Sequence, residues 1–424
     1  MKVIGLDIGT TTISAVVLQD GVLQESMTYQ NDTFLNDATA QWKKLQDPEK
    51  ILGIVTYALQ KLLVRHEDVC RIGLTGQQHG ILYLTKDGNP CSPLYTWQDG
   101  RGDQTTTEGE TYTEELRRLT GRQDLATGYG MVTHYYNLKN GLVPDDASTF
   151  CTIQDYVAMK LAGKTKPSVD PSDGASFGLF LVDEGRFDGA ALEKAGIDPQ
   201  ILPELATEKR IGTGALGIPI YVAIGDNQAS FLGATGGKPG SMLINMGTGG
   251  QFSAFSSTCI SCEGLETRPF PMGGWLLVGA SLCGGRAYAT LEAFFRAAVR
   301  MYTGVEPGSC YGAMERMLDE KSRPVDLPIV TPLFQGTRKD PALRGTIENI
   351  STDNLTPLHL TYGLMHGMAA ELHGMYQCYL NAGGKAGPLF GSGNGLRKNR
   401  YLCWEFEALF GQPLQLSPYE EEAA

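Results

Sequence analysis

The chain opens with two short apolar runs separated by a glycine-containing turn. Residues 3–8 (VIGLDI) and 13–18 (ISAVVL) are rich in β-branched side chains, which favour strands. Gly9 and Thr10 lie between the two runs. The pattern predicts a β-hairpin that begins a mixed sheet.

An amphipathic helix is expected next, over residues 48–65. Its apolar residues recur at three- and four-residue spacing, as in one face of a helix: Ile51, Ile54, Val55, Ala58, Leu59 and Leu62. A strand at residues 71–75 follows and runs into the polar sequence GQQHG at residues 76–80.

A comparable order of elements starts again near residue 218. Residues 218–224 predict a buried strand that ends at Asp226, and residues 241–245 predict a strand that ends in MGTGG at 246–250. A long helix at residues 355–380 leads to a strand and to GSGNGLRKN at residues 391–399. This faint internal repeat predicts two α/β domains, 1–217 and 218–424, with a ligand cleft between them.

Length and charge limit the number of domains and the kinds of partner that the chain can have. A chain of 424 residues is too long for one compact core and fits two domains. A net charge of -12 with scattered Lys and Arg argues against nucleic acid or an anionic membrane as partner. No apolar run approaches the ~18 residues of a membrane span. Nine cysteines without regular spacing indicate reduced thiols and a cytoplasmic protein.

Glycine is abundant, with 53 residues, and it gathers in short loops where backbone can approach a ligand closely. In the first hairpin, Asp7 stands beside Gly9, Thr10 and Thr11, a group that can hold a phosphate and its Mg²⁺. The loop at 246–250 repeats this chemistry. The glycines at 391–395 can support an adenosine. Ordinary β-turns and a strand-to-helix connection remain the alternatives.

A carboxylate follows the strand at 218–224. Asp226 precedes Asn227 at the expected start of a helix. At the end of a strand, such a carboxylate can accept the proton of a substrate hydroxyl. It can equally cap the helix, and the residues alone leave both roles open.

Two other loops combine hydrogen-bonding side chains with one large aromatic ring. They are GQQHG at 76–80 and YTWQDGR at 95–101, a mixture suited to sugar hydroxyls and C–H faces. By contrast, residues 158–165 only approximate a P-loop. A helix is predicted before Gly163, where a P-loop needs a strand. Cys259 and Cys262 form a single CxxC pair, which is weak support for a metal site.

Ten motifs occur in an order typical of one family: DIGTTT at 7, GQQHG at 76, WQDGR at 97, GYG at 128, DYVAMKLAG at 155, DPSDGASFGLF at 170, GDNQAS at 225, NMGTGGQ at 245, GASLCGGRAYATLEAFF at 279 and GSGNGLRKN at 391. Along its whole length the chain resembles the FGGY carbohydrate kinases. The resemblance implies two ribonuclease-H-like domains of the actin-like ATPase superfamily. It also implies ATP and Mg²⁺ as cofactors.

The resemblance further implies a role for each residue that matches a family motif. Asp226 would be the general base, and Asp7 would position Mg²⁺. The sugar would contact Gln78, His79, Trp97, Asp99 and Asn227. The nucleotide would contact Gly9, Thr10, Thr11, Gly247, Thr248, Gly249, Gly391, Gly393 and Asn399.

Within the family the motifs are most similar to those of sedoheptulokinases and next to those of xylulokinases. The expected reaction is ATP-dependent phosphorylation of a ketose, by a monomer or homodimer. Two departures bear on it: Ser14 stands where many members have a basic residue, and Gln78 replaces an apolar residue. The rival readings are an actin-like ATPase switch and a catalytically silent sugar sensor. The acidic run at 420–422 has the appearance of a first helical turn.

Overall fold

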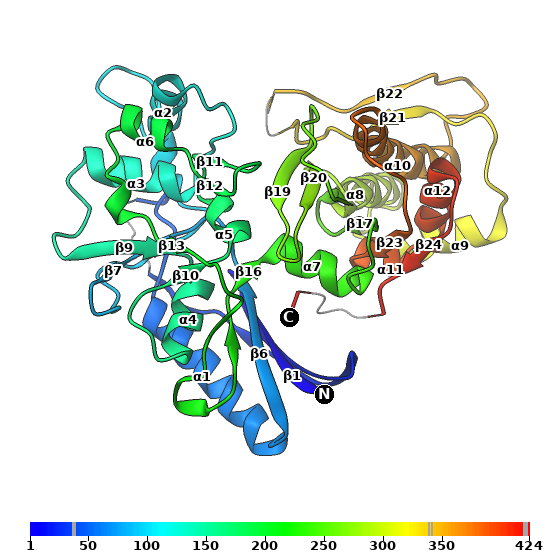
Figure 1. The fold of residues 1–424 in the computed structure, drawn as a ribbon. Coiled ribbons are helices and arrows are strands. Elements are labelled where there is room, and N and C mark those ends of the chain that lie inside the picture. The colour runs from blue at the N-terminus through cyan, green and yellow to red at the C-terminus, as the bar shows by residue number, and fades with distance from the viewer. Residues whose placement is uncertain (36–39, 338–339, 341, 419–422) are drawn as a thin grey trace. The chain divides into compact units, whose positions relative to one another are not determined.

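The computed structural model describes residues 1–35, 40–337, 340, 342–418 and 423–424 (Figure 1). The acidic run at 420–422 therefore lies outside the described residues. Contacts divide the chain into two compact units. Unit 1 comprises Met1–Gly233, Arg268–Gly273 and Glu421–Ala424, and unit 2 comprises Ala234–Thr267 and Gly274–Glu420. We describe each unit by itself.

The central sheet of unit 1 has seven strands. The predicted hairpin is confirmed, because β1 (Lys2–Ile8) pairs antiparallel with β2 (Thr12–Gln19), which pairs with β3 (Val22–Gln30). On the other side of β1, β6 (Val69–Gly76) runs parallel to it. The sheet continues through β15 (Ile220–Tyr221) and β14 (Arg210–Gly212), while β16 (Ile224–Gly225) also pairs with β6.

The segment at 218–224 differs from the single strand predicted for it. Ile220 pairs with Ile72 and Ile224 pairs with Thr75, so this segment carries one more residue than β6 over the same stretch. An extra residue interrupts a ladder, as in a β-bulge. The predicted strand is therefore divided into β15 and β16.

Helix α1 (Pro48–Arg65) has the predicted bounds. Asp47 caps it by accepting hydrogen bonds from the amides of Glu49 and Lys50. The other helices of unit 1 are α2 (Tyr112–Thr120), α3 (Gly130–Lys139), α4 (Ile153–Leu161), α5 (Pro171–Ser176), α6 (Gly189–Ala195) and the greater part of α7 (Asp226–Thr235). Its 3₁₀ helices are η1 (Gly100–Asp103), η2 (Pro199–Ile201) and η3 (Gly214–Leu216).

Short strands complete unit 1. They are β4 (Phe34–Leu35), β5 (Leu45–Gln46), β7 (Leu82–Thr85), β8 (Leu94–Tyr95), β9 (Ala147–Cys151), β10 (Ser168–Val169), β11 (Phe180–Leu181), β12 (Arg186–Phe187) and β13 (Glu204–Leu205). The P-loop-like sequence falls at the end of α4, and Gly163 follows with a φ of 68°. A helix thus precedes this glycine, as predicted.

Unit 2 is built on a six-stranded sheet. Its strand order is β19 (Glu266–Pro269), β20 (Trp275–Ser281), β18 (Gly250–Ser256), β17 (Met242–Met246), β23 (Leu389–Ser392) and β24 (Leu414–Leu416). Its helices are α8 (Gly285–Thr303), α9 (Tyr311–Glu320), α10 (Pro357–Asn381), α11 (Asn394–Arg397) and α12 (Arg400–Phe410), with a separate β21 (Ile329–Thr331) and β22 (Thr346–Glu348) pair.

The two sheets share one plan. In each, an antiparallel hairpin carries a Gly-Thr turn, a third antiparallel strand extends its second strand, and a parallel strand flanks its first. These are β1, β2, β3 and β6 in unit 1, and β17, β18, β20 and β23 in unit 2. The internal repeat seen in the sequence is therefore a repeat of sheet topology.

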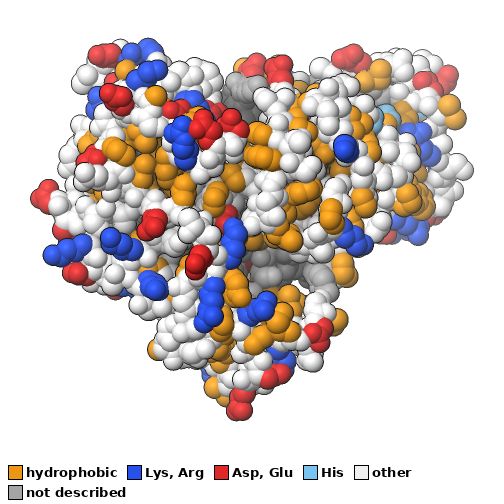
Figure 2. Space-filling view, viewed as in Figure 1, with side chains coloured by type: hydrophobic (Ala, Val, Ile, Leu, Met, Phe, Trp, Pro, Cys, Tyr) orange, Lys and Arg blue, Asp and Glu red, His pale blue; other side chains and the backbone are white. Residues whose placement is uncertain are grey.

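Asp226 belongs to unit 1. The strand before it, β16, pairs with β6 and is thereby part of the first sheet. The division by contacts falls after Gly233, so the domain boundary at 217/218 stays a prediction. No helix in the described part of the chain has the length and apolarity to cross a membrane. Figure 2 shows acidic and basic side chains interspersed on the face in view.

Candidate active site

The turn between β1 and β2 begins with a carboxylate. Asp7 pairs with Ser14 across the hairpin and with Thr75 of β6, so it stands at the carboxyl end of two parallel strands. A Cβ on Gly9 would lie 2.9 Å from the carbonyl oxygen of Thr12, which makes glycine the residue that fits this turn. Ser14 is buried and its hydroxyl lies 3.1 Å from that of Thr28.

Side chains hold this first turn from several directions. The Thr10 hydroxyl donates to Oε1 of Gln77 at 3.1 Å and accepts from the indole N–H of Trp97 at 2.9 Å. Gln46 donates to the Thr10 carbonyl at 3.0 Å, and Asn31 donates to the Gly9 carbonyl at 2.8 Å. Because the Thr10 hydroxyl gives its one proton to Gln77, the donors of this turn that remain for a ligand are its backbone amides and the exposed Thr11.

His79 follows β6 in an unusual backbone conformation. Its φ is 72°, a left-handed value that is uncommon outside glycine. Its Nδ1 lies 2.7 Å from the carbonyl oxygen of Ser176, and since a carbonyl only accepts, Nδ1 carries a proton. The ring stacks on Tyr129 with centroids 4.3 Å apart. Backbone strain of this kind is found at functional sites, where surrounding contacts maintain it.

The loop from Thr96 to Arg101 presents Trp97, which is 47% exposed. Thr96 donates from its hydroxyl to the Lys44 carbonyl at 2.8 Å, and the Gly100 amide donates to the Trp42 carbonyl at 2.8 Å. On its other side, Gly128 has a φ of 88°, and a Cβ there would lie 1.9 Å from the carbonyl oxygen of Trp97. The loop therefore holds the indole in a fixed position.

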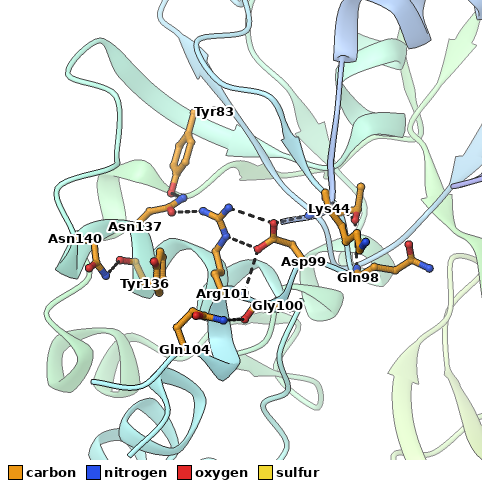
Figure 3. Close-up of polar contacts among 11 residues, drawn as sticks. Lys44, Tyr83, Gln98, Asp99, Gly100, Arg101, Gln104, Tyr136, Asn137 and Asn140 are labelled. Atoms are coloured by element: carbon orange, nitrogen blue, oxygen red, sulfur yellow. Dashed lines mark hydrogen bonds and ion pairs between the residues drawn. The ribbon is translucent and has the colours of Figure 1, made fainter. Parts of the chain in front are cut away.

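A buried ion pair fixes the end of this loop, as Figure 3 shows. Arg101 Nε lies 2.6 Å from Oδ1 of Asp99, and the other oxygen of Asp99 accepts from the Lys44 amide at 3.1 Å. The guanidinium also donates to Asn137 and lies over the Tyr95 ring, 4.0 Å from its centroid. Asp99 is fully buried, so its observed role is to hold the loop. A direct contact of Asp99 with sugar stays a prediction.

The carboxylate of Asp226 is partly exposed at the start of α7. Its Oδ1 accepts from the backbone amide of Asn227 at 2.7 Å and from Nδ2 of Asn227 at 2.9 Å. Among the described residues, it makes none of the bonds to the second or third amide of the helix that an N-cap makes. Desolvation raises the pKa of Asp226, and the positive charge of Arg268 opposes that rise.

Gln78 is buried and its amide has a defined orientation. Its Nε2 donates to the Ser172 carbonyl at 2.9 Å, and its Oε1 lies 3.5 Å from Nη1 of Arg268. Unit 1 thus contains Asp226, Asn227, Gln78, His79 and Trp97, the predicted base and four of the predicted sugar contacts.

The corresponding turn of unit 2 is supported by backbone. The Gly285 amide donates to the Gly247 carbonyl at 2.8 Å, and the Arg286 amide donates to the Thr248 carbonyl at 3.1 Å. Gly249 fits closely, because a Cβ there would lie 2.7 Å from the Ser281 carbonyl oxygen. Thr248 is exposed, and its hydroxyl has no hydrogen-bond partner among the residues that the structure describes.

The predicted adenosine loop lies beside this turn within unit 2. Gly391 pairs in parallel with Ile244 of β17, and the pairing ends at the next residue, Ser392. Gly393 has a φ of 86°, and a Cβ there would lie 2.6 Å from the Met246 carbonyl oxygen. Asn399 instead caps α12, since its Oδ1 accepts from the amides of Tyr401 and Leu402. An adenosine contact by Asn399 stays a prediction.

The donor set fits Mg²⁺ held together with phosphates. The described residues include no group of three His, Cys, Asp or Glu side chains that could hold a metal by themselves. Mg²⁺ usually binds through one or two carboxylates, several waters and the phosphates of its substrate. Asp7, partly exposed beside the first turn, can supply one such carboxylate.

A family model that describes the N-terminal domain of the FGGY family of carbohydrate kinases matches residues 2–233. The chain belongs to this family. It is a carbohydrate kinase, an enzyme that transfers a phosphoryl group to an alcohol group. The segment matched by the family model ends where contacts end the first stretch of unit 1.

Two relatives of this FGGY kinase match nearly its whole length. Sedoheptulokinase from Mus musculus is 27% identical, with 97% of this chain and 93% of the relative covered. Xylulose kinase from Staphylococcus xylosus is 24% identical, with 94% and 84% covered.

Solved structures agree with the fold of the FGGY kinase. Xylulose kinase from Rhodospirillum rubrum has a TM-score of 0.83 at 20% identity, with 100% of this chain and 88% of that chain covered. Gluconate kinase from Lactobacillus acidophilus has a TM-score of 0.81 at 16% identity, with 100% and 87% covered. At these identities the likeness establishes the two-domain α/β fold.

Two residues beside the site were not found from the sequence. Arg268 is separated from Gln78 by 190 positions, and no motif marks it. Gln77 was visible in GQQHG, but only the structure connects it to the first turn through Thr10. For Arg268, the sequence offered one signal: this residue immediately precedes a proline in the short strand β19, which begins with Glu266.

Proposed function

We propose that this FGGY kinase transfers the terminal phosphoryl group of ATP to a hydroxyl group of a ketose, with sedoheptulose as the first candidate. The sedoheptulokinase relative supports this substrate through its 27% identity over 97% of the chain. The observation that carries the proposal is Asp226, a partly exposed carboxylate that shares unit 1 with Gln78, His79 and Trp97.

In the proposed reaction Asp226 accepts the proton of the attacking hydroxyl. Both bonds from Asn227 go to Oδ1, which leaves the other carboxylate oxygen for that proton. Phosphoryl transfer depends on placement and charge neutralisation more than on covalent help. Trp97 offers a ring face to the sugar, and His79 offers an imidazole whose tautomer is set by Ser176.

The nucleotide phosphates would be bound by the two Gly-Thr turns. The amides from Gly9 to Thr11 and from Gly247 to Gly249 are suited to anionic oxygens, because such turns direct N–H groups to one point. Asp7 would hold Mg²⁺, which neutralises phosphate charge when bound. The glycines at 391–393 would lie against the adenosine.

Xylulose is the second candidate substrate, favoured by the xylulose kinase relative. An ADP-release assay over sedoheptulose, xylulose, ribulose, fructose and glycerol, with a no-sugar control, tests the proposal. We expect ADP release to depend on sugar and to be fastest with sedoheptulose. Release that no sugar changes would favour an ATPase switch. Tight sugar binding without ADP release would favour a sensor.

A further inference from the structure

Arg268 is a charged residue of unit 1 to which the proposed reaction gives no role. Arg268 is in the short segment Arg268–Gly273, through which the chain rejoins unit 1. This segment is attached to α7, since Gln228 donates to the Pro269 carbonyl at 3.0 Å and Phe231 packs edge-on against Phe270. Because Asp226 begins α7, these contacts hold the segment that starts with Arg268 against the helix that starts with Asp226.

Arg268 is buried, with 8% of its surface exposed. A buried guanidinium needs partners for its charge and its N–H groups. One of them is the amide oxygen of Gln78, 3.5 Å from Nη1. That oxygen faces Arg268 because the other end of the Gln78 amide is held by α5, through the carbonyl of Ser172 at 2.9 Å and the carboxyl of Asp173 at 3.4 Å.

Gln78 connects α5 to the guanidinium, and Arg268 begins the segment that is attached to α7, the helix that Asp226 begins. We propose that Arg268, oriented by Gln78, is a positioning residue that keeps Asp226 ionised for proton acceptance. This inference rests on the proposed function, because it concerns the same carboxylate.

The charges around Asp226 determine whether loss of Arg268 raises or lowers the pKa of Asp226. Desolvation raises the pKa of Asp226, and Arg268 lowers it. Asp173 on α5 also faces it, but desolvation raises the pKa of Asp173 well above the usual range, so that carboxyl keeps its proton to higher pH. Asp7 and His79 lie at the ends of the adjacent strands β1 and β6. Among the described residues, Arg268 is thus the cation whose charge lowers the pKa of Asp226, and its removal should raise that pKa.

The test is the pH dependence of ketose-dependent ADP release by Arg268→Gln. A base must be ionised to act, so activity falls as pH drops through its pKa. An opposite charge nearby lowers a carboxyl pKa by about 1–3 units. We expect Arg268→Gln to move the acid limb of kcat upward by about one pH unit. In Arg268→Lys, which keeps the positive charge, the acid limb should lie close to its wild-type pH. In Gln78→Met it should shift upward by part of the amount expected for Arg268→Gln. Arg210→Gln, at an exposed arginine of unit 1, is the matched control.

A second measurement does not depend on turnover. In the native protein, Arg268→Gln leaves the Asp226 charge without its cation, so the melting temperature at pH 7 should fall. Combined with Asp226→Asn, the same substitution should lower it markedly less. Should Arg268→Gln fail to fold, Arg268→Lys and Gln78→Met carry the test of the acid limb.

An unchanged acid limb in folded Arg268→Gln, or additive losses in the stability cycle, would overturn the inference. A wild-type protein that releases no ADP with any sugar would instead refute the proposed function. The stability cycle would still report whether the two charges interact.

Discussion

In unit 1 the turn between β1 and β2 is held by side chains, whereas in unit 2 the turn between β17 and β18 is held by backbone. Thr10 makes two hydrogen bonds with its hydroxyl, to Gln77 and from Trp97. Thr248 is exposed and its hydroxyl makes none within the described part of the chain. The same Gly-Thr sequence on the same sheet plan therefore has two different surroundings.

This difference indicates that the two turns have different roles. The Thr10 hydroxyl connects the first turn to the loop that presents Trp97, so the proposed phosphate turn and the proposed sugar platform are linked within unit 1. The Thr248 hydroxyl can donate to a nucleotide without first breaking a bond. We infer that the second turn binds phosphate with its side chain and the first binds it mainly with amides.

The largest effect on stability is expected from a substitution at Gly284 in unit 2, which lies against the backbone of Gly249. A Cβ on Gly284 would lie 2.2 Å from the carbonyl carbon and oxygen of Gly249. Gly284→Ala should lower the free energy of unfolding by about 3 kcal/mol, since overpacking against fixed backbone forces a shift. Denaturant unfolding measures this loss.

Gly247→Ala is the matched control, in the turn against which Gly284 packs. Its Cβ would find nothing nearer than Oδ1 of Asn245, at 3.9 Å. Its free energy of unfolding should change by less than about 1 kcal/mol. Equal losses in the two variants would contradict the view that Gly284 packs tightly against the backbone of this turn.

A smaller effect separates the two threonines. Thr10→Val leaves Gln77 and Trp97 without a shared partner, and it should cost about 1–3 kcal/mol in stability. Thr248→Val removes an exposed hydroxyl and should change stability by less than about 0.5 kcal/mol, while it raises KM for ATP. Unfolding curves and ATP titrations of both variants provide the comparison. A Thr10→Val protein as stable as the wild type would remove the distinction between the turns.

The local elements of both units could be predicted because their signals are local. The apolar face of α1 and the β-branched runs of β1 and β2 are complete within a few residues, and both predictions are confirmed. The repeat of sheet plan was visible as a repeat of Gly-Thr turns. The division into β15 and β16 was not, because a bulge depends on the register with β6.

Side-chain surroundings were harder to predict than positions. WQDGR marked Asp99, but its burial against Arg101 depends on Lys44 and Asn137, which no motif connects. Asn399 likewise occurs in a family motif, but its role as the cap of α12 depends on the backbone conformation at the start of that helix. Arg268 reaches Gln78 across 190 positions, a contact that one sequence without an alignment cannot reveal.

Asp226→Asn tests the central claim most directly. The substitution keeps the size of the side chain but removes a group that can accept a proton at neutral pH. With saturating ATP and ketose, we expect the rate of ADP release to fall at least ~10²-fold while the sugar still binds, as measured by calorimetry. A variant that turns over near the wild-type rate would show that another group takes the proton.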